Sequence, residues 1–100
     1  MKDEIVATVK RAERLLTECG WNDRAEWFRA RRLSMETHAE ASDDFKRIAR
    51  EIGSVLVGMG SFSDVPMYPK EGSAITRGEA LAEQWNLVEE LGKLTKIAGV

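Results

Sequence analysis

The stretch TRGEALAEQWNLVEELGKLTKIAG, residues 76–99, carries the clearest helix pattern of the chain. Thr76 and Glu79 have the spacing of a capping box, in which each side chain accepts a hydrogen bond from the other residue's backbone N–H. Gly99 is placed to end the helix. Two adjacent apolar stripes predict that neighbouring elements contact this helix from two sides. The stripes consist of Leu81, Trp85, Val88, Gly92 and Thr95, and of Leu87, Leu91, Leu94 and Ala98.

Three segments upstream have apolar residues at steps of three and four, which is the spacing of amphipathic helices. We expect helices over residues 3–19, from residue 22 or 23 to about 37, and from residue 42 onward. Gly20 should end the first helix, and a capping box at Asp23 should begin the second. The apolar stripe of the third helix consists of Phe45, Ile48, Ile52, Val55, Leu56 and Met59.

The helical pattern stops at residues 58–74, which hold both prolines and three of the eight glycines. Because no alternating strand pattern is present, the four amphipathic segments predict an all-α fold. We expect a four-helix bundle-like single domain over residues 1–100, with this one long Gly- and Pro-containing loop before the last helix. Loops of this length are uncommon unless they are functional or disordered. Gly53, inside the third helix, would allow another helix to approach closely.

Composition and charge exclude several classes of protein. Fifteen Lys and Arg face seventeen Asp and Glu, and the net charge of −2 argues against a generic nucleic-acid binder. No apolar run approaches the roughly 20 residues of a membrane helix, and the charged N-terminus does not suit a secretory signal. We therefore expect a cytoplasmic protein with no membrane contact. One cysteine and one histidine cannot form an internal disulfide or a His-rich metal site, so we predict no metal and no cofactor.

Two stretches of the sequence partly resemble functional motifs, a phosphate-binding loop and a catalytic triad, but neither meets the requirements of its motif. The glycine-rich residues 58–61 follow a helix, whereas a phosphate loop leads into the N-terminus of one. A Ser–His–Asp triad would depend on the single His38, and no nucleophile-elbow pattern surrounds either nearby serine. We predict no catalytic residues and no enzyme. A small-ligand protein, with a pocket lined by Ser61, Asp64 and Tyr68, remains an alternative.

Arginines are densest in the second helix. The cluster consists of Arg24, Arg29, Arg31 and Arg32. At about 100° per residue these side chains do not share one clean basic face. We expect them to pair with acidic neighbours such as Asp23, Glu26 and Glu36 on the surface. The alternative is a nucleic-acid-associated regulator that binds through the cluster.

The long loop carries large apolar side chains outside any helix. They are Phe62, Val65, Met67 and Tyr68. Either they fold back and close the bundle, or some stay exposed as anchors for a partner protein, because aromatic and Met side chains are enriched at interface cores. Acidic residues on the last helix offer a second surface to a basic partner. The candidate partner-binding residues are therefore Phe62, Asp64, Met67, Tyr68, Glu79 and Glu83.

Residues 52–69, centred on the GMGSFSD stretch of residues 58–64, resemble a family of small, uncharacterised bacterial helical proteins. Members of that family carry a GMGSFND-like stretch followed by an apolar run. The second helix around residues 21–28, with its Glu-Trp-Phe, is also similar. Here Ser63 stands where an Asn is more usual, and Pro66 interrupts the apolar run. The resemblance implies an all-helical, non-enzymatic bacterial protein.

Some small acidic proteins of this style serve as immunity proteins beside secreted toxins. The single-domain size, the mild acidity and the apolar loop fit that class. We therefore expect a protein-binding protein, most concretely an immunity protein that neutralises a cognate toxin domain by occupying its active site.

Overall fold

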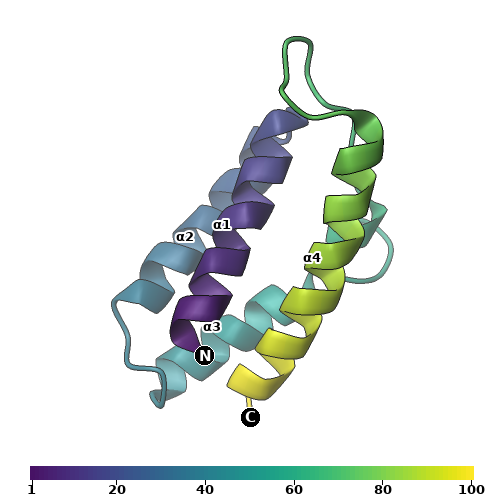
Figure 1. The fold of residues 1–100 in the computed structure, drawn as a ribbon. Coiled ribbons are helices and arrows are strands. Elements are labelled where there is room, and N and C mark those ends of the chain that lie inside the picture. The colour runs from purple at the N-terminus through teal and green to yellow at the C-terminus, as the bar shows by residue number, and fades with distance from the viewer.

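The computed structural model describes all residues 1–100, which form four α-helices, one short 3-10 helix and no strands (Figure 1). The elements are α1 (Lys2–Glu18), α2 (Asn22–Glu36), α3 (Asp43–Ser54), η1 (Phe62–Asp64) and α4 (Arg77–Ala98). The predicted all-α, bundle-like fold is confirmed. None of the helices combines the length and the apolar character that crossing a membrane requires.

Helices α1, α2 and α4 run along the length of the bundle, and the shorter α3 packs near one end (Figure 1). At the opposite end the loop before α4 is tied to α1, because the backbone N–H of Lys70 donates to the carbonyl of Glu18 at 2.8 Å. That loop reverses direction at Gly72, which has a positive φ of 84°. Both chain termini lie at the α3 end of the bundle, away from this turn (Figure 1).

One contiguous hydrophobic core joins all four helices and the loop, and the predicted apolar stripes supply most of it. Its largest fully buried side chains include Phe45, Phe62, Ile5, Leu16, Met35, Ile52, Met67, Leu87 and Leu91. Burying a side chain of this size contributes about 1.5–3 kcal/mol to the free energy of unfolding. The core therefore extends beyond the regular helices into the long loop.

Local signals at the helix ends are confirmed in all but one case. Gly20 adopts a φ of 81° after α1, and the side chain of Ser42 accepts a hydrogen bond from Phe45 at the start of α3. The predicted capping box begins α4. The capping box expected at Asp23 is wrong, because α2 starts directly after Trp21, which has no side-chain cap. The backbone N–H of Trp21 is already bonded to the carbonyl of Leu16 at 2.8 Å, so the turn is tight and Asp23 falls inside the helix.

The third helix is shorter than its apolar stripe suggests. It ends at Ser54, because the carbonyls of Val55 and Leu56 accept hydrogen bonds from the backbone N–H groups of Phe62 and Ser63, at 2.8 and 2.9 Å. These bonds fold the following loop back onto the end of α3. Met59, expected in the buried stripe, is instead fully exposed.

Helix α3 packs against the C-terminal half of α4. A Cβ on Gly53 would lie only 2.8 Å from Thr95 Oγ1, which confirms the close approach expected at this glycine. The guanidinium of Arg50 also donates to the carbonyl of Gly99. Because α3 is short, it leaves the N-terminal part of that α4 face open, and Trp85 is 60% exposed. The prediction that neighbouring elements contact α4 from two sides is nevertheless confirmed, because α4 packs against both α1 and α3.

Candidate functional site

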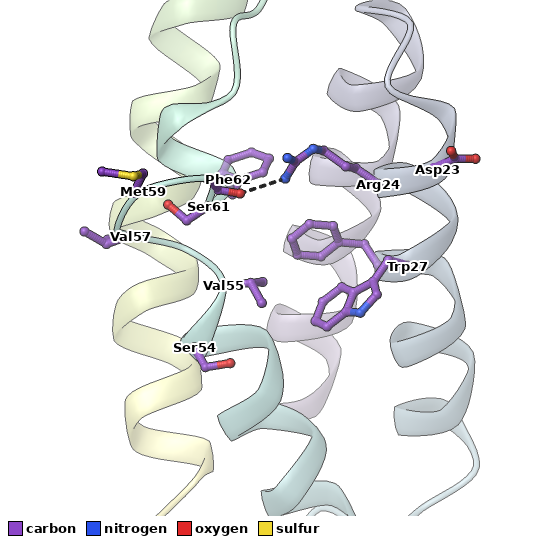
Figure 2. A pocket seen from close by; sticks show the side chains of 11 residues that line it. Asp23, Arg24, Trp27, Ser54, Val55, Val57, Met59, Ser61 and Phe62 are labelled. Atoms are coloured by element: carbon purple, nitrogen blue, oxygen red, sulfur yellow. Dashed lines mark hydrogen bonds between the residues drawn. The ribbon is translucent and has the colours of Figure 1, made fainter.

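A cleft of about 540 Å³ lies between α2 and the segment of residues 54–62 that follows α3 (Figure 2). The buried rings of Phe28 and Phe62 line its base. Trp27 and Val55 line the cleft from opposite sides, one from α2 and one from the segment after α3. The remaining lining residues are Asp23, Arg24, Ser54, Val57, Met59, Gly60 and Ser61. The cleft is thus a mainly apolar hollow with two charged residues, Arg24 and Asp23, at its edge.

Aromatic contacts fix the base of the cleft. Phe28 meets Trp27 edge to face, with ring centroids 5.2 Å apart, and meets Phe62 in the same way at 5.7 Å. Such pairs contribute about 0.5–1.5 kcal/mol each beyond the burial of their area. The guanidinium of Arg31 lies 4.1 Å from the centroid of the Trp27 ring and holds the indole from outside. The base and one wall are therefore preorganised.

The loop between α3 and η1 is held by a dense set of hydrogen bonds. Besides the two backbone bonds at the end of α3, the Asp64 carboxylate accepts from the N–H of Gly60 at 3.0 Å. The Ser61 hydroxyl donates to the carbonyl of Gly58. Gly58 and Gly60 have φ values of 120° and 73°, a region that L side chains rarely adopt. The glycines are thus needed for the turn, and the loop has one defined shape.

This loop exposes apolar side chains at its tip. Met59 is 100% exposed and Val57 is 72% exposed, and Figure 2 shows both pointing away from the base of the cleft. Met59 was not expected on the surface, because its spacing continues the apolar stripe of the third helix. The two glycines that flank it were the signal of a turn with an outward tip. We call Val57 and Met59 the apolar tip.

Two of the predicted partner-binding residues are not on the surface. Phe62 is 2% exposed and Met67 is 0% exposed, because both close the bundle from within the loop. The buried Gln84 explains this arrangement, since its Nε2 donates to the carbonyls of Phe62 and Val65 at 2.9 and 2.8 Å. Tyr68 is 60% exposed, with the guanidinium of Arg77 4.0 Å from its ring centroid. Of the two outcomes expected for the loop, Phe62 and Met67 thus fold back and close the bundle, whereas Tyr68 stays exposed.

Each acidic residue of the predicted partner-binding set makes a different contact within the chain. Asp64 bonds the backbone of its own loop, and Glu79 completes the capping box of α4, where its hydrogen bond to the backbone N–H of Thr76 lowers its pKa. Glu83 lies on the side of α4 that faces α1 and pairs with Arg11 at 2.6 Å. That hydrogen bond raises the pKa of Arg11 above its ordinary value. Glu79 and Glu83 line one hollow between α4 and α1, and Asp64 does not take part in it.

The arginine cluster is largely engaged by the protein itself. Arg29 pairs with Glu26 at 3.2 Å and Arg31 with Glu51 at 3.6 Å. Arg32, only 13% exposed, pairs with Glu13 and Glu36 at 2.6 and 2.7 Å, and the hydrogen bond to Glu13 is the largest cause of its raised pKa. The pairs with Glu26 and Glu36 were predicted. Arg24 differs, because its Nη1 donates only to the carbonyl of Gly60.

The residues considered for catalysis do not converge. His38 lies in the connection between α2 and α3, where its ring nitrogens approach the Ser34 carbonyl at 2.7 Å and Asp44 at 3.6 Å. Ser61 lines the cleft, whereas Asp64 and Tyr68 do not. No group of three or more His, Cys, Asp or Glu side chains is placed to hold a metal ion. Comparisons of the chain with protein-family models, curated proteins and solved structures found no match.

Proposed function

We propose that this chain is a small protein-binding protein, most concretely an immunity protein that neutralises a cognate toxin by direct binding. The observation that carries the proposal is Met59, which is fully exposed at the tip of a loop whose backbone is fixed by hydrogen bonds. Burying a Met side chain in a partner yields about 1.5–3 kcal/mol. A loop whose backbone is already ordered loses little conformational entropy on binding.

The surroundings of the apolar tip favour a protein over a nucleic acid as partner. The cleft beside the tip is walled by aromatic and aliphatic side chains, the residue types enriched at the cores of protein interfaces. Nucleic-acid binding would need several free cations along one face. Three of the four clustered arginines are paired with carboxylates of the same chain, which weakens the regulator alternative.

An inhibitor that occupies a toxin's active site needs an element that protrudes and keeps its shape. The loop between α3 and η1 has both properties, because Gly58 and Gly60 form the reversal and Asp64 holds it closed. The small size and the mild acidity of the chain, which are in the style of immunity proteins, support this proposal.

The proposal is tested with the protein encoded by the gene adjacent to that of this chain. The two proteins are coexpressed, growth is recorded with and without this chain, and the affinity of the purified pair is measured calorimetrically. The variants are Met59→Asp and, as a matched control, Ile97→Asp, because Ile97 is 60% exposed on α4 away from the cleft. We expect rescue of growth, binding weakened at least about tenfold by Met59→Asp, and little effect of Ile97→Asp.

Three outcomes would contradict the proposal. The neighbour-encoded protein could be harmless and fail to bind, the complex could form without restoring growth, or Met59→Asp could bind as tightly as Ile97→Asp. Circular dichroism of both variants checks that they remain helical. Since Met59 is fully exposed and Ile97 is mostly exposed, neither variant should lose helicity.

A further inference from the structure

We infer that the cleft beside the apolar tip receives a peptide segment of the partner protein in which a carboxylate stands next to an apolar side chain. Arg24 would bind the carboxylate, and the hollow over Phe28 and Phe62 would take the apolar side chain. The inference rests on the proposed function, because it names the chemistry of the partner segment at the same surface.

Arg24 is the cation at the edge of the cleft. It forms no ion pair, whereas Arg29, Arg31 and Arg32 each have a carboxylate within 4.0 Å. A guanidinium carries five N–H donors, and Arg24 uses one of them, on the Gly60 carbonyl at 3.2 Å. Figure 2 shows its side chain reaching over the cleft, while the carboxylate of Asp23 points away from it.

The position of the Arg24 guanidinium is fixed from two directions. Its Cζ lies 5.6 Å from the centroid of the Trp21 ring, and the bond to Gly60 ties it to the loop on the far side of the cleft. Trp21 is itself held, because its indole N–H donates to the carbonyl of Pro66 at 2.8 Å. A guanidinium placed in this way can bind a carboxylate through paired N–H groups.

The hollow below that guanidinium is lined mainly by apolar side chains. Its base is formed by two buried rings, and Trp27 and Val55 complete its walls. A volume of about 540 Å³ lies in the range of sites that enclose small ligands, so it holds a side chain and its neighbour rather than a long segment. One cation beside an apolar hollow matches one carboxylate beside an apolar side chain, and does not match a row of phosphates.

The test is an NMR titration of the full-length, nitrogen-labelled protein with three tetrapeptides blocked at both ends. They have the sequences Gly-Leu-Glu-Gly, Gly-Leu-Gln-Gly and Gly-Ser-Glu-Gly. We expect the first to shift the Trp27 indole and the Gly58 and Gly60 amide signals. The second and third, which lack the charge or the apolar side chain, should bind about tenfold more weakly.

Variants assign the effect to Arg24. Arg24→Met keeps the aliphatic stem, and it should lower the affinity for Gly-Leu-Glu-Gly to that for the Gln peptide. Arg24→Lys should retain part of the preference. Arg14→Met is the matched control, because Arg14 is exposed and lies outside the cleft, and it should leave the affinity unchanged. Backbone spectra report whether each variant keeps its fold.

Equal affinity for the Glu and Gln peptides, shifts located elsewhere on the protein, no shifts at all, or unaltered selectivity in Arg24→Met would overturn the inference. Its failure can be told apart from that of the proposed function. If the toxin complex is weakened by Met59→Asp and unaffected by Arg24→Met, the function stands and the cleft has another role. If the peptides select for Arg24 while no toxin is neutralised, the cleft chemistry stands and the function fails.

Discussion

The ring of Phe28 on α2 meets the ring of Phe62 in η1 edge to face, with centroids 5.7 Å apart and planes at 74°. This contact joins the second helix to a loop that lies far along the chain. Both side chains are buried. The loop between α3 and α4 is consequently part of the hydrophobic core, and its conformation and the stability of the bundle depend on each other.

Replacing Phe62 with Ala should therefore destabilise the whole protein. A buried Phe→Ala change costs about 3–5 kcal/mol of unfolding free energy, and each kcal/mol lowers Tm by about 4–8 °C in a domain of this size. Urea unfolding measures the change. Tyr68→Ala is the matched control, because Tyr68 is exposed and loses mainly its contact with Arg77, worth about 1 kcal/mol or less. Similar costs for the two substitutions would show that Phe62 is not a core residue.

Two helical glycines should respond to Ala in opposite directions. At Gly92 a Cβ would meet nothing within 4 Å, so Gly92→Ala should stabilise the protein by about 1 kcal/mol through helix propensity alone. At Gly53 the Cβ would lie 2.8 Å from Thr95 Oγ1, so Gly53→Ala should destabilise it by about 1–3 kcal/mol. Thermal unfolding of both variants checks the signs.

The cause at Gly53 can be isolated in a second background. Thr95→Ala removes the Oγ1 atom that the new methyl group would strike, and leaves Thr95 Cβ at a tolerable 3.4 Å. Gly53→Ala should then cost much less than in the natural chain. If Gly53→Ala destabilises the Thr95→Ala variant as much as it does the natural chain, the steric clash does not involve Thr95 Oγ1.

The start of α4 should loosen in acid. The pKa of Glu79 is lowered in the folded protein, chiefly by the hydrogen bond from the backbone N–H of Thr76. The ionised Glu79 side chain therefore makes its full contribution to stability at pH values above the ordinary pKa of Glu. This contribution to stability is lost as the pH falls below the ordinary pKa of Glu and through the lowered pKa of Glu79. The protection of the Thr76 and Glu79 amides from hydrogen exchange, each compared with an unprotected amide at the same pH, measures the loss from about pH 6 to about pH 2. Glu79→Gln keeps an oxygen acceptor that does not titrate, so its exchange at these amides should lack this pH dependence.

The ion pair between Arg32 and Glu13 should stabilise the α1–α2 contact more than an exposed pair does. Both side chains are only 13% exposed and their atoms approach to 2.6 Å. Glu13→Gln should cost about 1–3 kcal/mol, because it leaves a largely buried guanidinium with a weaker acceptor. Glu26→Gln is the control, since its pair with Arg29 is exposed and should be worth about 0.5 kcal/mol or less. A double-mutant cycle that gives equal couplings for the two pairs would contradict this expectation.

Local chemistry was sufficient to predict the helices and most of their ends. Apolar spacing placed all four helices, and the Thr76 capping box and Gly20 act over a few residues of chain. The predictions failed where hydrogen bonds from residues farther along the chain decide the structure instead of the local spacing of apolar residues. Met59 continues a helical stripe, yet hydrogen bonds from Phe62 and Ser63 end the helix before it.

The candidate site was harder to predict than the fold. The loop could be singled out from the sequence, but which of its side chains are buried depends on distant residues such as Gln84, which donates to two loop carbonyls from α4. The cleft itself exists only because α2 and the segment after α3 come together in space. No spacing within one helix indicates that Arg24 would be left without a carboxylate.

The placement of the chain ends has a consequence for engineering. Met1 and Val100 lie at one end of the bundle, and the exposed Gly72 turn lies at the other (Figure 1). A circular permutant that joins the original ends through a flexible linker and opens the chain at Gly72 would keep every helix pairing, since exposed turns are the sites at which such rearrangements succeed. The new ends would emerge beside the N-terminus of α4, which provides an attachment point remote from α3 while leaving the core connectivity of α1, α2 and α3 unchanged.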